Sequence, residues 1–189
     1  MKELRTQIGG KFSKQNPGIF ELKHRLVHAG IIVNYPTGDS IIKTVSGVDL
    51  SFDPDLSPLS FYEVECEYLK SVRNSSFHTV HNVFQNNNGY VGRSAGMEIG
   101  YAILHHVPIV LLHKPSFQRS IDVVVSEILN SKVRFFNILR LDCLPDNDLI
   151  EKLNSISELR VDYDLSVEDE IVIMTFVHAV LNEYRIQCI

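Results

Sequence analysis

The sequence predicts an α/β fold built on a doubly wound, mostly parallel sheet of about five strands with helices on both faces. Short apolar runs alternate along the chain with segments of helical length that carry an apolar stripe. Turns rich in glycine, asparagine and proline separate these segments. Such alternation is typical of βαβ units, in which a crossover helix returns the chain to a parallel strand.

Composition places the chain among ordinary globular proteins. Hydrophobic residues make up 44% and charged residues 22% of its 189 residues, which suits a single domain spanning 1–189. The net charge of −5 gives no excess of positive charge to bind a nucleic-acid backbone, so we expect no nucleic-acid partner. Three widely spaced cysteines favour neither a disulfide framework nor a zinc site. Without a leader-like or membrane-length apolar run, we expect a cytoplasmic protein with no membrane partner.

The N-terminal segment predicts the first βαβ unit. Residues 4–8 are a strand candidate that leads into Gly9-Gly10-Lys11-Phe12. The dipeptide Asn16-Pro17 is a preferred helix start, and the helix that follows ends at Gly30, before a strand at 31–33. The glycine pair has two interpretations. It is either a flexible turn with a solvated lysine, or a set of backbone N–H groups beside a positive charge that suits a phosphate or hydroxyl.

The segment 37–60 is rich in glycine, serine, aspartate and proline, and we expect it to be a lid or hairpin insertion. Two β-prone runs within residues 41–52 are able to pair as its hairpin. Ser60 and Glu63 then have the spacing of a capping box, which predicts a helix to about residue 73. Glu63 and Glu67 share one face of that helix, which is either solvated or in contact with a substrate.

A second βαβ unit surrounds residues 89–102, Gly-Tyr-Val-Gly-Arg-Ser-Ala-Gly-Met-Glu-Ile-Gly-Tyr-Ala. An apolar strand candidate at 77–84 precedes this stretch, and another at 108–112 follows it. Residues 95–106 predict the intervening helix. Its apolar stripe comprises Met97, Tyr101 and Leu104. The two units together predict a flavodoxin- or Rossmann-like sheet, in which ligands bind beyond the carboxyl ends of the strands.

Glu98 is the residue of this unit that calls for an explanation. We expect it near the first helical turn, where the macrodipole and the free N–H groups favour a negative charge. Gly96 has no Cβ, so we expect a substrate to approach the backbone there. The spacing alone leaves two interpretations open: a carboxylate that merely offsets the helix dipole, or a group that performs chemistry.

The C-terminal part predicts a helix at 116–132, a last strand at 133–141 and a short polar helix at 145–156. The residues expected on the buried face of the first of these helices are Phe117, Ile121, Val124, Val125 and Ile128. A terminal helix at 166–186 is apolar round most of its circumference, so something besides the sheet must cover it. Either a second copy of the chain covers it, which predicts a homo-oligomer, or the preceding helix folds over it. The covering residues would then be Leu149, Leu153 and Ile156.

The stretch from Gly96 to Ala102, followed by a short turn and an apolar strand, resembles the signature of nucleoside 2-deoxyribosyltransferase-like proteins, including their deoxynucleoside 5′-monophosphate N-glycosidase relatives. The likeness covers residues 77–112 and extends to 4–36. It implies cleavage or transfer at the N-glycosidic bond of a 2-deoxyribonucleoside or its 5′-monophosphate. In that family the motif glutamate, here Glu98, attacks C1′ and displaces the base, with no cofactor.

The resemblance also implies roles for other residues. Tyr90 and His78 are the candidates to assist the leaving base. His78 stands where the family has an aspartate, and Gly92 stands where its transferases carry an acid. We expect Ser94 to be the N-cap of the motif helix. The implied substrate-binding residues are Gly9, Gly10, Lys11, Phe12, Asn82, Gly89, Gly92, Ser94, Gly96 and Met97.

No metal is expected, because His78 and His81 lack a further ligand at metal spacing. The expected partner is a small nucleoside or nucleotide. Family members assemble into oligomers whose neighbouring subunits complete each site, which also favours a homo-oligomer here. The alternative function is a non-catalytic module of the same fold that binds and senses a nucleotide, and a structural subunit is a third interpretation.

Overall fold

The structure is a computed structural model that describes residues 3–11, 18–36, 38, 43–45, 48–50, 57–85, 87–133, 136–137, 145–158 and 161–186. The strands of its main sheet are β1 (Arg5–Gly10), β2 (Ile32–Val33), β5 (Phe77–His81), β9 (Ile109–Leu111) and β11 (Phe136–Asn137). They lie in the order β11-β9-β5-β1-β2, and each neighbouring pair is parallel. The predicted α/β class with a mostly parallel sheet is confirmed.

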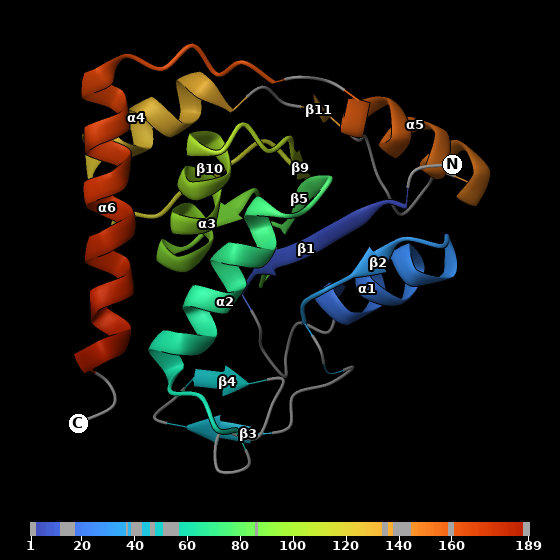
Figure 1. The fold of residues 1–189 in the computed structure, drawn as a ribbon, viewed down its shortest axis with the longest axis horizontal. Coiled ribbons are helices and arrows are strands. Elements are labelled where there is room, and N and C mark those ends of the chain that lie inside the picture. The colour runs from blue at the N-terminus through green and yellow to red at the C-terminus, as the bar shows by residue number, and fades with distance from the viewer. Residues whose placement is uncertain are drawn as a thin grey trace.

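Helices cover this sheet through two separate buried clusters. They are α1 (Gly18–His28), α2 (Phe61–Arg73), α3 (Arg93–Leu104), α4 (Val123–Lys132), α5 (Asp146–Glu158) and α6 (Val167–Ile186). Successive side chains of a strand point to opposite faces, so Phe77 and Val80 of β5 belong to different clusters. Phe77 packs with α1 and α5, whereas Val80 packs with α2, α3, α4 and α6. Figure 1 shows α1 and α5 to the right of the sheet and α3, α4 and α6 to its left.

Helix α3 occupies an inner position, with the sheet on one side and α6 on the other (Figure 1). Every residue from 95 to 100 is buried. Two glycines allow α6 and the segment before α4 to come close. A Cβ at Gly96 would lie 2.8 Å from Ile121 Cδ1, and one at Gly100 would lie 2.9 Å from Ile173 Cγ2. The expectation of a single apolar stripe on α3 is therefore wrong, because a second layer of helix covers its other side.

The predicted helix at 116–132 is wrong over its first part. Ser116–Phe117 is a strand, β10, which pairs in parallel with β8 (Tyr90–Val91). The helix α4 begins later, because the Asp122 side chain accepts a hydrogen bond from the Val124 N–H at 2.8 Å and caps it. Val124, which was expected on the buried face of this helix, is 54% exposed, whereas Val125 is buried as expected.

Other expected boundaries agree more closely with the structure. Ser60 and Glu63 form the predicted capping box of α2. Gly30 has a φ of +80°, in the left-handed region, and follows the end of α1. Within the expected insertion, β3 (Lys43–Val45) and β4 (Val48–Leu50) pair antiparallel. The expected strand at 77–84 divides into β5 and β6 (Val83–Phe84), and β6 pairs with β7 (Asn87–Asn88). The dipeptide Asn16-Pro17 and most of residues 133–141 lie outside the described residues.

Helix α6 covers the segment predicted as the terminal helix, but α5 does not fold over it. The buried residues Leu149, Leu153 and Ile156 of α5 pack with α1, on the opposite face of the sheet. The prediction that these three residues hide α6 is therefore wrong. Instead α6 packs on α2, α3 and α4 through Ile173 and Phe176. No helix among the described residues is both long enough and apolar enough to cross a bilayer.

We predict that Gly100→Ala destabilises the wild-type protein and stabilises an Ile173→Ala background. Alanine gains about 1 kcal/mol over glycine inside a helix. Overpacking against Ile173 Cγ2 costs about 1–3 kcal/mol, because a β-branched side chain cannot turn its methyl group aside. Urea unfolding of the wild type, both single variants and the double variant measures the coupling. A Gly100→Ala gain of equal size in both backgrounds would contradict the close α3–α6 contact.

Candidate functional site

The carboxyl ends of β1 and β5 lie side by side, with Gly10 in register with His81. From β1 the chain crosses to β2 on one side of this pair, and from β5 it crosses to β9 on the other. The connections that leave the two strands therefore diverge. Open α/β sheets bind ligands at such a point.

The Glu98 side chain reaches this point from α3. The helix begins at Arg93 with Gly92 as its N-cap, so Glu98 lies in the second turn. The expectation that Glu98 sits near the first turn is wrong, because the helix starts two residues earlier than its sequence suggests. Glu98 is 5% exposed. A Cβ at Gly9 would lie 1.8 Å from Glu98 Oε2, so the carboxylate fits only because β1 has a glycine there.

The sheet beneath Glu98 carries two fully buried polar side chains, Gln7 of β1 and His78 of β5, which are in register. His78 Nε2 lies 3.3 Å from Glu98 Oε2. Within the described part of the chain, neither ring nitrogen of His78, neither amide atom of Gln7 and not Glu98 Oε2 makes a well-aligned hydrogen bond. A buried polar atom without a partner costs roughly 1–3 kcal/mol. Several such atoms lie together beneath Glu98, which makes this cluster a candidate functional site.

Helix α2 turns a second carboxyl group toward the same cluster. Glu65, Tyr68 and Val72 share one face of α2, and the Tyr68 hydroxyl donates to the Ile8 carbonyl of β1 at 2.5 Å. Glu65 retains some exposed surface. Burial of its carboxyl, followed by the negative charge of Glu98, nevertheless raises the pKa of Glu65 to about 8. Glu65 is therefore mostly a neutral acid at pH 7.

Helix α6 adds Tyr184 to the cluster. The Tyr184 hydroxyl lies 2.6 Å from Ser94 Oγ, one turn before Glu98. Burial raises the pKa of Tyr184, and the carboxylates of Glu65 and Glu98 raise it further. Burial also raises the pKa of Tyr68, and the same two carboxylates add to the rise. Both phenols therefore stay neutral, and two carboxyl groups from α2 and α3 share one buried polar cluster with them.

Three predicted substrate-binding residues of α3 serve packing instead. Ser94 is not the N-cap, a position that Gly92 holds without a side-chain cap, and its hydroxyl joins α3 to α6. Gly96 does not admit a substrate, because its open side faces Ile121 at 2.8 Å and Phe176 at 3.6 Å. Met97 is fully buried in the core. Glu98 turns toward the sheet, because it lies two positions from either glycine and so on the opposite side of the helix.

Two further predicted residues hold the loop after β5 in place. Gly89 has a φ of +96°, and a Cβ there would lie 2.2 Å from the Lys114 carbonyl oxygen. The Asn82 amide donates to the His113 carbonyl at 2.7 Å and accepts from the His113 N–H at 3.0 Å. Both residues therefore join the ends of β5 and β9. Gly10 likewise has a φ of +141° and lies against the His81 carbonyl.

Tyr90 and Lys11 both pack against the ring of Phe84, and Gly92 lies beside Tyr90. The Tyr90 hydroxyl would be 3.4 Å from a Cβ at Gly92. The Tyr90 ring packs on Phe84 with centroids 5.1 Å apart, and Lys11 Nζ lies 4.2 Å from the centre of the Phe84 ring. Burial raises the pKa of Tyr90, so its phenol is a weak acid. Phe12 lies outside the described residues.

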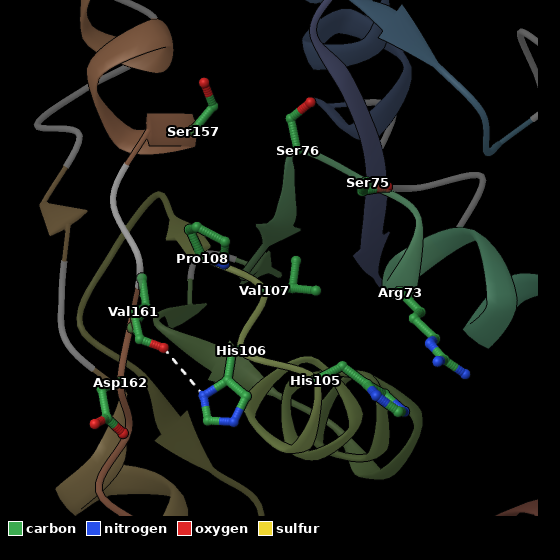
Figure 2. Close-up of a pocket in the computed structure, with 10 residues that line it drawn as sticks. All are labelled: Arg73, Ser75, Ser76, His105, His106, Val107, Pro108, Ser157, Val161 and Asp162. Atoms are coloured by element: carbon green, nitrogen blue, oxygen red, sulfur yellow. Dashed lines mark hydrogen bonds between the residues drawn. The ribbon is translucent and has the colours of Figure 1, made fainter.

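A cavity of about 510 Å³ lies at the other edge of the sheet, where β5 and β9 begin (Figure 2). Its lining includes Arg73, His105 and His106, and burial followed by the positive charge of Arg73 lowers the pKa of His105. Figure 2 shows Arg73 and His105 on one side of this cavity and Asp162 on the other. None of the residues predicted to form the site lines it. Its place at the amino ends of the strands separates it from Glu98.

No protein-family model, no curated protein and no solved structure matches this chain. The residues of the site are therefore the only guide to its chemistry.

Sequence reasoning missed Glu65, Tyr68 and Tyr184. A signal for the first two was present, because Glu65 lies three positions before Tyr68 and seven before the buried Val72. That spacing places all three on the apolar face of α2. The sequence directed attention to Glu63 and Glu67 as the acidic face of this helix. In the structure Glu63 is part of the capping box, and Glu67 forms an ion pair with Lys70 at 2.5 Å. No local pattern points to Tyr184, since it reaches the cluster only through the packing of α6.

We predict that the melting temperature of Glu65→Gln, relative to the wild type, rises as the pH increases from about 4.5 to about 8 and is then constant. In the unfolded chain Glu65 ionises near its ordinary value of about 4.3. The folded protein keeps its proton up to about pH 8, so wild-type stability falls across this interval. Glutamine cannot titrate. Glu67→Gln, on the same helix, is the control and should show a constant difference. A constant difference for Glu65→Gln would contradict the raised pKa.

Proposed function

We propose that the protein cleaves or transfers the N-glycosidic bond of a 2-deoxyribonucleoside or its 5′-monophosphate, with Glu98 as the nucleophile. The observation that carries this proposal is the Glu98 carboxylate, buried against the bare backbone of Gly9 where β1 and β5 end. Its Oε2 makes no well-aligned hydrogen bond within the described residues. Oε2 lies against Gly9 and 3.3 Å from His78 Nε2, so the sheet holds this oxygen in place and the other carboxylate oxygen is the one that attacks an electrophilic carbon.

We infer further that the sheet is doubly wound in the flavodoxin-like manner. Numbered along the chain, the five strands of the main sheet lie in the order 2-1-3-4-5. The two buried clusters on opposite faces support this inference. In that arrangement the ligand lies at the divergence after β1 and β5, which is the position of Gly9, Gly10 and Glu98.

The chemistry suits a 2-deoxyribose. Its C1′–N bond breaks through an oxocarbenium-like transition state, which forms more readily without a 2-hydroxyl group. The carboxylate at Glu98 bonds to C1′ as the base departs and forms a glycosyl ester. Attack on this ester by a second base gives transfer, and attack by water gives hydrolysis. Tyr90 and Lys11 pack against Phe84, and Gly92 lies beside the Tyr90 ring, so this group offers a stacking surface with a positive charge to the rest of the substrate.

We predict that Glu98→Gln lowers turnover of deoxynucleosides and their monophosphates by at least a thousandfold without lowering the melting temperature. The amide has the same shape but cannot form the ester, and it removes a buried charge. Base release and base exchange, followed by chromatography, measure the two reactions. Glu127→Gln, an exposed residue of α4, is the matched control.

Turnover retained by Glu98→Gln would refute the nucleophile. Saturable binding of a nucleotide to the wild type without release or exchange of its base would support the alternative, a module that binds without turnover.

We propose that the protein forms a homodimer through α6. Val167, Ile171 and Met174 lie at i, i+4 and i+7 and are 68%, 55% and 48% exposed. They therefore form one apolar stripe on the outer helix layer. A two-fold mate that offers the same stripe covers both copies with one contact.

We predict sedimentation at micromolar concentration as a species of twice the 21.5 kDa chain mass, and a monomer for Met174→Glu with an unchanged fold. A buried charge at the interface weakens association strongly. Val27→Glu, at a 51% exposed apolar residue of α1, is the control and should remain dimeric. A wild-type monomer would refute the interface.

A further inference from the structure

We propose that Glu65 is the proton donor for the departing base, an inference that rests on the proposed function. Glu65 occupies the face of α2 that carries Tyr68 and Val72, and Tyr68 is hydrogen-bonded to the backbone of β1 one residue before Gly9. The side chain therefore belongs to the buried group formed by Glu98, Tyr68 and Tyr184. The two carboxyl groups reach that group from different helices, so a substrate at the ends of β1 and β5 meets both.

The buried polar side chains around Glu98 distinguish this cluster from an ordinary acidic patch. Glu98, Gln7 and His78 are each at least nine-tenths buried, and each has a polar atom without a well-aligned hydrogen bond in the described part of the chain. A fold that served stability alone would satisfy these atoms or replace them with apolar ones. Gln7 and His78 lie in register on neighbouring strands, and His78 contacts Glu98, so this concentration of buried polar groups points to a ligand site.

Glu65 suits the proton-donor role better than the two candidates that the sequence suggested. His78 is fully buried on the sheet beneath Glu98 and contacts the nucleophile itself, 3.3 Å away. It holds the carboxylate in position from the side opposite a substrate. Tyr90 is a phenol whose pKa burial raises, so it gives up a proton poorly near neutral pH. Glu65 keeps some exposed surface and is mostly protonated at pH 7.

The proposed step balances. As a Glu98 oxygen bonds to C1′, the C1′–N bond breaks and its electron pair passes to the base. The Glu65 carboxylic acid gives its proton to a ring atom of that base, which departs neutral, and Glu65 becomes a carboxylate. In the second half, water or an incoming base attacks C1′ and gives a proton to Glu65, while the ester bond to Glu98 breaks. Both carboxyl groups return to their starting states.

The test compares leaving groups. Glu65→Gln, Glu98→Gln and the control Glu67→Gln are assayed on a deoxynucleoside 5′-monophosphate and on 4-nitrophenyl 2-deoxyriboside 5-phosphate, whose nitrophenolate departs without a proton. We expect Glu65→Gln to lose a factor of about 10²–10⁴ in kcat/KM on the nucleotide and less than about tenfold in kcat/KM on the nitrophenyl substrate, because kcat/KM reports the departure of the leaving group and not the later breakdown of the ester. Wild-type activity on the nucleotide should also fall above about pH 8, and this decline should be absent from the nitrophenyl reaction.

Equal losses of kcat/KM on both substrates, or none on either, would overturn the role of Glu65 and leave the proposed function standing. An inert wild type on both substrates would instead overturn the proposed function and this inference with it. Glu65→Asp keeps a carboxylic acid and should recover part of the nucleotide rate. Melting temperatures of all variants separate a lost proton from a lost fold.

Discussion

The approach of the Glu98 carboxylate to the backbone of β1 is the constraint on which the rest of the site depends. A side chain at Gly9 would overlap Oε2 at 1.8 Å, so the contact requires a strand with no side chain at that position. It also requires that α3 pack closely on the sheet. Ile173 and Phe176 of α6 pack on the other side of α3 and hold it there. The charge is thus held by the packing of two layers rather than by the dipole at a helix end.

The sequence predicted those parts of the fold that depend on local pattern. The α/β class, the capping box at Ser60 and the end of α1 at Gly30 follow from periodicity and from backbone preferences of single residues. The strand at Ser116–Phe117 could not be predicted from local pattern, because it forms only through its pairing with β8. A two-residue strand has no period of its own, and the apolar residues near it look helical. Pairing between distant segments is the information that a local pattern lacks.

The site divides in the same way. Glu98 was predictable because its motif surrounds it in sequence, and its contact with His78 agrees with the expectation that both belong to one site. The roles of Gly96, Met97 and Ser94 were not predictable, since the faces of α3 are distinguished only by what covers them. Glu65 and Tyr184 come from helices far from the motif, so their membership depends on the packing of α2 and α6. Residue type and spacing single out Glu98, whereas tertiary packing selects the residues that surround it.

The two glycines that flank Glu98 in sequence have a consequence for how such motifs evolve. Gly96 and Gly100 pack against α6 and the segment before α4, whereas Glu98 packs against the sheet on the other side of the same helix. One short run of residues therefore meets two independent packing requirements. A relative whose outer helix were displaced by a few ångströms would be free to drift to alanine at both glycines and keep its chemistry. A chain with both glycines and no glutamate would retain the packing of the helices without the buried carboxyl group.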